Sequence, residues 1–175
     1  MVQGDRRHDM ENKGFCAPER GFTLIEMMVV IVLMTVLLAM ALPSFTGLIE
    51  RYRVEGMANA LVASVSQARA EAARRGTTVT IQQRAECRGR DWSCGWDTLV
   101  ASGSTSETLK RQDPDGRVAI EKNTGGAMSF DAMGYSTGAT SFGFRPSDSD
   151  SSPNAVAVCL SLGGRVKLVK GDGSC

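Results

Sequence analysis

The feature that most constrains this chain is an apolar run from Phe22 to Leu42, which Pro43 follows. Roughly 21 residues at a rise of 1.5 Å per residue make a helix of about 31 Å, enough to cross the hydrocarbon core of a bilayer. The only ionisable side chain in the run is Glu26. A carboxylate in lipid is costly unless it is paired, so Glu26 either has a functional role or lies at the headgroup level, where the helix dipole also favours an acid. The run therefore predicts a membrane helix with one acid that needs an explanation.

The composition argues against several classes of function. The 175 residues have room for one membrane helix and one domain with its own core. The chain has 20 Lys and Arg residues against 19 Asp and Glu residues, so no overall charge points to nucleic acid or to an acidic partner. The only histidine, His8, lies before the apolar run, so the part that follows lacks the usual general base and the commonest metal ligand. We therefore expect no enzymatic activity, no cofactor and no metal site.

Four cysteines follow the apolar run, namely Cys87, Cys94, Cys159 and Cys175, whereas Cys16 precedes it. An even set is typical of disulfides outside the cytoplasm. Of the three possible pairings we favour Cys87 with Cys94 and Cys159 with Cys175, because the polar turns between them can bring each pair together. A zinc site is the alternative, but the chain has no CxxC pair and its histidine lies far upstream.

An amphipathic helix is predicted after Pro43, extending to about Arg75. Its apolar residues recur mostly at intervals of three and four, with charged residues between them: Leu48, Tyr52, Met57, Leu61, Val65, Ala68 and Ala72. Gly76 provides a stop for this helix. Because Pro43 lacks an amide donor and Gly47 is close to it, we expect the long helix to bend at Pro43.

The pattern then changes from the helical period to that of strands. Residues 77–82 alternate between the two faces of a half-buried strand. Further short strands are predicted at 96–101, 117–120, 127–130, 140–144, 155–160 and 165–169, with clusters of turn residues between several of them. We therefore expect an α+β fold in which a long helix packs on antiparallel sheet.

The segment Arg20-Gly21-Phe22-Thr23-Leu24-Ile25-Glu26 resembles the class III leader of type IV pilins and type II secretion pseudopilins. The resemblance implies that a prepilin peptidase cuts between Gly21 and Phe22 and methylates the new amino terminus at Phe22. It also implies that Glu26 meets the charged amino terminus of a neighbouring subunit and that Pro43 kinks the helix. A charge pair in a low dielectric selects geometry more than it adds net stability, so Glu26 would set the register between subunits.

The same resemblance divides the chain into four segments. Residues 1–21 would be the leader, 22–42 the transmembrane assembly helix, 43–76 its amphipathic continuation and 77–175 a β-rich periplasmic domain. The leader has mixed charge, so the orientation rests mostly on Arg20 and on cleavage at the cytoplasmic side. We expect a single-pass protein of the bacterial inner membrane that is later incorporated into a pilus or a pseudopilus.

Four stretches of the soluble part are similar to the GspH/FimT/FimU group, at residues 67–72, 92–96, 130–134 and 161–166. Members of this group are minor pilins or minor pseudopilins. The resemblance implies a minor type IV pilin that helps to initiate pilus assembly near the filament tip, with other major and minor pilins as its partners. One alternative is the minor pseudopilin H of a type II secretion system, and another is a tip pilin that binds DNA for uptake.

Basic residues near the carboxyl end are the candidate site for DNA. Arg165 and Lys167 are two positions apart and so share one face of a predicted strand, and Lys170 follows them. In some FimT-type minor pilins of naturally transformable bacteria a Gly-Arg-x-Arg motif of this region binds DNA, but Lys167 lacks the bidentate fork of arginine. We favour a solvated face or an edge strand protected by charge, because the chain lacks overall basicity and interleaved aromatic residues.

Overall fold

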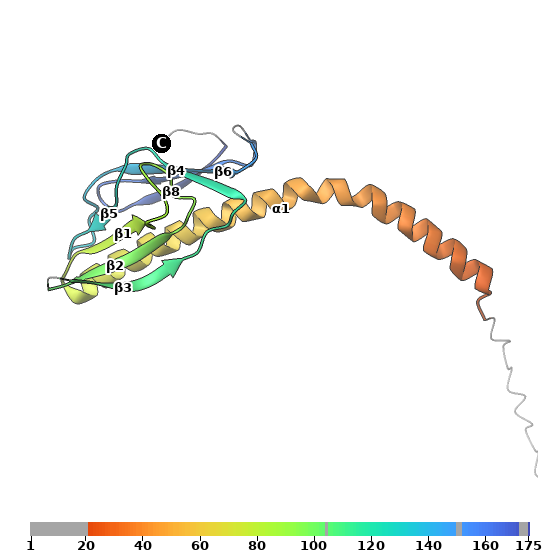
Figure 1. The fold of residues 1–175 in the computed structure, drawn as a ribbon, viewed down its shortest axis with the longest axis horizontal. Coiled ribbons are helices and arrows are strands. Elements are labelled where there is room, and N and C mark those ends of the chain that lie inside the picture. Colours follow the sequence, from red (N-terminus) through yellow and green to blue (C-terminus); the bar gives the residue numbers. More distant parts are fainter. Residues whose placement is uncertain (1–20, 104, 150–151, 172–174) are drawn as a thin grey trace, which may run out of the picture. The chain divides into compact units, whose positions relative to one another are not determined.

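The computed structural model describes residues 21–103, 105–149, 152–171 and 175, with side chains for all of these except 41–44. A helix, α1, comes first and the strands β1 to β8 follow it (Figure 1). Contacts divide the chain into two compact units, Met1–Ala41 and Leu42–Cys175. The elements are α1 Leu24–Arg75, β1 Val79–Gln83, β2 Trp96–Ser102, β3 Thr105–Gln112, β4 Val118–Lys122, β5 Met128–Phe130, β6 Thr140–Pro146, β7 Val156–Leu160 and β8 Val166–Lys170.

The first unit contains the amino-terminal part of α1. Thr23 caps this helix, because its side-chain hydroxyl accepts a hydrogen bond from the backbone N–H of Glu26 at 3.2 Å. All side chains from Phe22 to Met40 are exposed. No single helix among the described residues has the length and hydropathy of a membrane span, whereas Leu24–Met40 and Phe45–Arg75 meet that requirement together. The predicted membrane helix thus presents its apolar side chains outward along its described length.

The rest of α1 places one face in the core of the second unit. Its buried side chains recur every three or four residues: Val54, Met57, Ala58, Leu61, Val65, Ala68 and Ala72. The sequence pattern starts this face at Leu48, but Leu48 and Tyr52 are 44% and 67% exposed. The buried face therefore begins only at Val54. The helical period of apolar residues identifies the side of α1 that faces the core. It does not show at which residue the sheets begin to bury that side.

The helix ends where Gly76 predicts. Gly76 has φ +65°, the left-handed conformation that favours glycine. The backbone N–H of Thr77 donates to the carbonyl oxygen of Ala72 at 3.2 Å, which is the long hydrogen bond of a Schellman motif. The chain then enters β1 at Val79.

The strands form two antiparallel sheets of four strands each, with the orders β3-β2-β1-β5 and β4-β6-β7-β8. The inner residues of both sheets and the buried face of α1 form one hydrophobic cluster. The α+β prediction is confirmed, and the antiparallel sheet that the sequence predicts is divided in two. The predicted strands coincide with β1, β2 and β4 to β8 to within two residues at each end.

The strand β3, at Thr105–Gln112, is absent from the strands predicted by the sequence pattern. This strand lies at the edge of the first sheet, and none of its side chains is fully buried. It pairs with β2 across a register shift between Thr98 and Leu99. An exposed edge strand needs no alternation of polar and apolar residues, so its polar sequence gives no strand signal.

Two tryptophans occupy the centre of the core. The side chain of Trp92 is fully buried and packs edge to face on Phe142, with ring centroids 5.0 Å apart. The indole N–H of Trp96 donates to the hydroxyl of Ser64 on α1 at 3.0 Å, so the helix and β2 share a buried hydrogen bond. Trp96 thus links β2 to the helix, and Trp92 anchors the loop between β1 and β2 on the second sheet.

Candidate functional site

The amino-terminal segment carries the residues that the sequence assigns to processing and assembly. Phe22 is 78% exposed, and Glu26 is exposed in the first turn of α1. Among the described residues, a Cβ atom added at Gly21 would meet nothing within 4 Å. Packing against that part of the chain therefore does not require a glycine at position 21. A requirement for glycine there would come from another protein that reads the segment.

Some of the predicted features fall outside the described part. The leader up to Arg20 and the cysteine Cys16 lie outside the described residues. The side chain of Pro43 also lies outside them, so the kink there stays a prediction. The role of Glu26 depends on a second subunit, and it stays a prediction as well.

The carboxyl-terminal basic residues lie at an open groove on the second sheet. The groove has a volume of ≈ 860 Å³ and includes Arg165, Lys167 and both members of the Cys159–Cys175 pair in its lining. Cys159 and Lys167 are directly opposite each other on β7 and β8. Among the described residues, the side chains of Arg165 and Lys167 have no ion-pair or hydrogen-bond partner. The sequence thus correctly places these two cations together.

Lys170 does not join them. It pairs in register with Val156, whose side chain is buried in the core, so it extends from the opposite face of β8. Its ammonium group forms an ion pair of 3.1 Å with Glu55 on α1. The hydrogen bonds from Arg51 and then from Lys170 lower the pKa of the Glu55 carboxyl. Lys170 therefore links β8, an edge strand of the second sheet, to α1.

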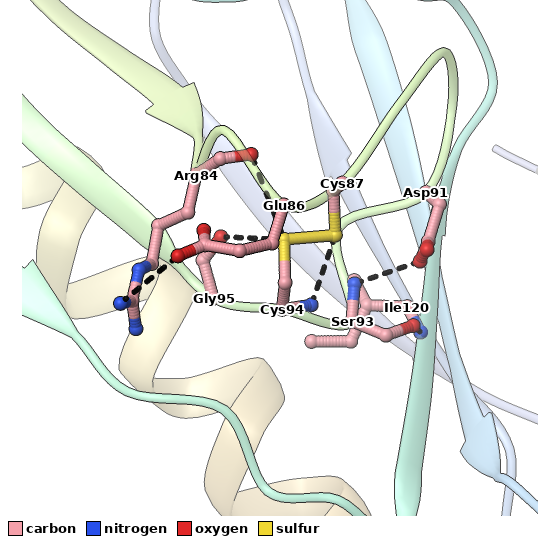
Figure 2. Close-up of a disulfide and its surroundings, with 8 residues drawn as sticks. All are labelled: Arg84, Glu86, Cys87, Asp91, Ser93, Cys94, Gly95 and Ile120. Carbon is pink, nitrogen blue, oxygen red and sulfur yellow. Dashed lines mark hydrogen bonds and ion pairs between the residues drawn. A yellow bond between two sulfur atoms is a disulfide. The ribbon is translucent and has the colours of Figure 1, made fainter.

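Both pairs of cysteines that the sequence analysis favours are bonded in the structure, Cys87 with Cys94 and Cys159 with Cys175. The first closes the loop between β1 and β2 (Figure 2), where the backbone N–H of Cys94 also points at the Cys87 sulfur at 3.0 Å. Arg84 lies beside this loop and forms ion pairs with Glu86 at 3.6 Å and with Asp113 at 3.4 Å. The second disulfide joins β7 to residue 175 beside the groove.

The sequence analysis missed the role of Arg69, which holds two turns against α1. Its guanidinium donates to the carbonyl oxygen of Gly134 at 2.9 Å and to that of Gly164 at 2.8 Å. The turns join β5 to β6 and β7 to β8, and the N–H of Ser136 in one donates to the oxygen of Leu162 in the other at 3.0 Å. We call this arrangement the Arg69 clasp. In the sequence Arg69 is only one of the charged positions between apolar ones, which gives no signal of the role.

A buried lysine is the second residue that sequence reasoning missed. Lys122 is 3% exposed, and its ammonium group donates to the carbonyl oxygens of Gly126 at 2.8 Å and Ala127 at 3.3 Å. The same group lies 5.8 Å from the centroid of the Trp92 ring. Burial lowers the pKa of Lys122. These contacts close the loop after β4, and they are a structural feature of the core.

The comparisons with known proteins agree with this architecture. The family model "Type II transport protein GspH" matches residues 57–164, and the model "Prokaryotic N-terminal methylation motif" matches residues 16–42. The comparison with curated proteins finds no match.

Solved structures of minor pilins and pseudopilins share the fold. A crystal structure of the type IV minor pilin FimU of Pseudomonas aeruginosa is 23% identical with a TM-score of 0.58, covering 72% of this chain and 97% of FimU. The minor pseudopilin EpsH of the type 2 secretion system of Vibrio cholerae is 10% identical with a TM-score of 0.54, covering 67% of this chain and 96% of EpsH.

The fold is therefore the α+β fold of these type IV pilin-like structures, with an amino-terminal helix and an antiparallel β domain. Because its family model covers more than half of the residues, the chain belongs to the GspH family of type II transport proteins.

Proposed function

We propose that this chain is a minor type IV pilin of the FimT/FimU type, which enters the filament through the first part of α1 and helps to initiate assembly near the tip. The observation that carries the proposal is the exposed apolar helix Leu24–Met40, which lies within the match to the N-terminal methylation motif at residues 16–42. Apolar side chains that point outward in a single chain need lipid or neighbouring helices to cover them. The lipid of an inner membrane buries these side chains before assembly, and the helices of neighbouring subunits bury them in a filament.

Processing would prepare the subunit for this transfer. Cleavage by a prepilin peptidase after Gly21 leaves Phe22 as a methylated, positively charged amino terminus. Glu26 of a neighbouring subunit is the acid that this terminus meets in the filament. Apolar packing alone permits many registers, whereas a pair of opposite charges in a low dielectric permits few. The pair thus fixes the axial position of the new subunit.

The test uses the full chain with an epitope tag, expressed in bacteria that assemble the corresponding filament. Gly21→Ala is expected to block leader removal, because the peptidase reads this position. Gly47→Ala is the matched control, since a Cβ there also meets nothing within 4 Å. Glu26→Gln is expected to leave leader removal intact and to lower the amount of the chain in sheared filaments. Normal incorporation of the Glu26→Gln chain would contradict the proposed pairing.

The minor pseudopilin H of a type II secretion system is the second candidate. Membership of a family of type II transport proteins favours it, whereas the higher identity to FimU than to EpsH favours a pilus. Deletion of the gene distinguishes the two. A pilin is needed for surface filaments, and a pseudopilin is needed for release of secreted proteins while the surface filaments remain.

DNA binding at the tip is a third candidate, and the groove beside Arg165 and Lys167 favours it. Two cations without an acidic partner among the described residues are available for phosphates. The double variant Arg165→Ala/Lys167→Ala is expected to weaken DNA binding by the full chain and to reduce its salt dependence. Lys170→Ala is the matched control, because Lys170 extends from the other face and is paired with Glu55. Equal loss in both variants would contradict a site in the groove.

A further inference from the structure

A second cavity lies in the unit Leu42–Cys175, beside the first turns of the part of α1 that belongs to this unit. It has a volume of ≈ 400 Å³, within the usual range of small-ligand sites. Two parts of the chain line it, namely one face of α1 and the ends of β4 and β6: Thr46, Ile49, Glu50, Arg53, Arg117, Pro146, Ser147 and Asp148. We call this cavity the helix-base pocket. It lies wholly within the unit Leu42–Cys175.

The helix-base pocket is lined by equal numbers of positive and negative side chains, and these side chains do not form ion pairs with one another. Arg53 and Arg117 supply two guanidinium groups, and Glu50 and Asp148 supply two carboxylates. Within the described part of the chain, none of these four side chains forms an ion pair. Most other arginines here are paired with an acid or with carbonyl oxygens. A ligand with separate positive and negative groups would satisfy both signs at once.

The pocket is close along the chain to the end of the apolar run. Thr46 and Arg53 follow Leu42 by 4 and 11 positions, so helical geometry puts them at most about 6 and 17 Å beyond it. Side chains on a helix lean toward its amino terminus, and the long stem of arginine places the charge away from its own Cα position. Polar headgroups occupy the roughly 5–8 Å next to each surface of the hydrocarbon core. The Thr46 end of the pocket therefore lies, measured along the helix, within the depth of the headgroup layer.

The helix surface beside the pocket is apolar and exposed. Phe45, Leu48, Ile49 and Tyr52 are 54%, 44%, 49% and 67% exposed. Their spacing puts them along one side of α1, and Ile49 also lines the pocket. Aromatic residues with nearby cations are typical of helix segments at a membrane surface. This surface suits the glycerol and upper acyl region of a lipid whose headgroup occupies the pocket.

We propose that the helix-base pocket binds the zwitterionic phosphoethanolamine headgroup of a membrane lipid. The phosphate accepts hydrogen bonds from Arg53 and Arg117, since guanidinium groups match phosphate oxygens. The primary ammonium donates to the carboxylates of Glu50 and Asp148. Bare phosphate satisfies only the arginines and is repelled by the two acids. The proposal rests on the membrane anchoring that the proposed function includes, and it gives the subunit a second attachment to the bilayer before assembly.

The test uses the full chain in detergent micelles, with the arginine Nε–H signals observed by NMR. Glycerophosphoethanolamine is expected to shift the signals of Arg53 and Arg117. Glycerophosphocholine has the same phosphate but a quaternary nitrogen that cannot donate, and inorganic phosphate has no cation. Both are expected to bind at least tenfold more weakly. Equal binding of all three would overturn the zwitterion site in favour of a plain anion site, and absence of shifts would overturn the proposal outright.

Two variants complete the experiment. Arg53→Gln/Arg117→Gln is expected to abolish binding of glycerophosphoethanolamine, whereas Arg88→Gln removes an exposed cation in the loop between β1 and β2 and is expected to leave it unchanged. Retention of binding by the first variant would overturn the assignment. Leader removal and filament incorporation, measured on the same variants, report on the proposed function independently. A subunit that assembles normally but never binds the headgroup would contradict this inference alone.

Discussion

The Arg69 clasp makes Gly164 the position at which a single methyl group should have a large effect. Gly164 has φ +72°, where an alanine costs about 1–2 kcal/mol in backbone energy. A Cβ added there would lie 2.6 Å from Nε of Arg69 and 2.9 Å from the carbonyl oxygen of Gly134. The guanidinium can move away, but it then leaves two carbonyl oxygens. Each such charged hydrogen bond contributes about 1.5–3 kcal/mol, so the loss of both bonds together with the backbone cost should lower the free energy of unfolding of Gly164→Ala by about 4–8 kcal/mol.

The measurement is equilibrium urea unfolding of the full chain in detergent micelles with both disulfides intact, followed by fluorescence of the buried Trp92 and Trp96. At about 3 °C per kcal/mol, the midpoint of thermal unfolding should fall by about 10 °C or more. Gly76→Ala is the matched control, because Gly76 has φ +65° and a Cβ there meets nothing within 4 Å. It should lower the free energy of unfolding by only the backbone cost, about 1–2 kcal/mol.

A double-mutant cycle isolates the part of the effect that passes through the clasp. In an Arg69→Ala chain the guanidinium is already absent, so Gly164→Ala should cost at least about 1 kcal/mol less than it does in the unmodified chain. The reasoning is refuted if Gly164→Ala and Gly76→Ala have equal effects, or if the cycle shows no coupling between positions 69 and 164.

Three further predictions concern contacts elsewhere in the unit Leu42–Cys175. Gly95→Ala should prevent folding, because its Cβ would overlap the backbone oxygen of Gln112 on β3, and the yield of oxidised, protease-resistant protein measures this. Since burial lowers the pKa of Lys122, the unfolded chain binds more protons, so the free energy of unfolding should rise toward alkaline pH. Lys122→Met should remove that rise in pH-dependent urea unfolding. Lys170→Ala should raise the pKa of Glu55 toward its usual value in an NMR titration, because an ion pair is lost, and an unchanged pKa would contradict this pairing.

Sequence patterns predict those elements in which buried and exposed side chains alternate with a regular period along the chain. The β1 residues Val79 and Ile81 are buried and alternate with less buried neighbours, so the strand is legible from its sequence. The same logic fails for β3, where Glu107 and Arg111 sit on an exposed edge and pair with charged groups instead of facing the core. Periodicity also extended the predicted buried face of the helix back to Leu48, whereas the sheets cover it only from Val54 onward.

The candidate sites also divide into residues that a local sequence rule brings together and residues whose partners are distant in the sequence. Arg165 and Lys167 could be grouped because alternation along a strand is a local rule, and the same rule excludes Lys170. Arg69 could not be found, since its partners are contributed by two distant turns. Lys122 could not be found either, because lysine is rarely buried and its acceptors are backbone oxygens, which leave no trace in the sequence.

The Arg69 clasp also has a consequence for the order of folding. Arg69 is separated by 65 positions from Gly134 and by 95 positions from Gly164. Contacts at such separations close large loops, so they are expected to form after the helix and the local hairpins. Interactions absent from the transition state act on the rate of unfolding and little on the rate of folding. We therefore expect the clasp to set how long the folded domain persists, with little influence on how quickly it first forms.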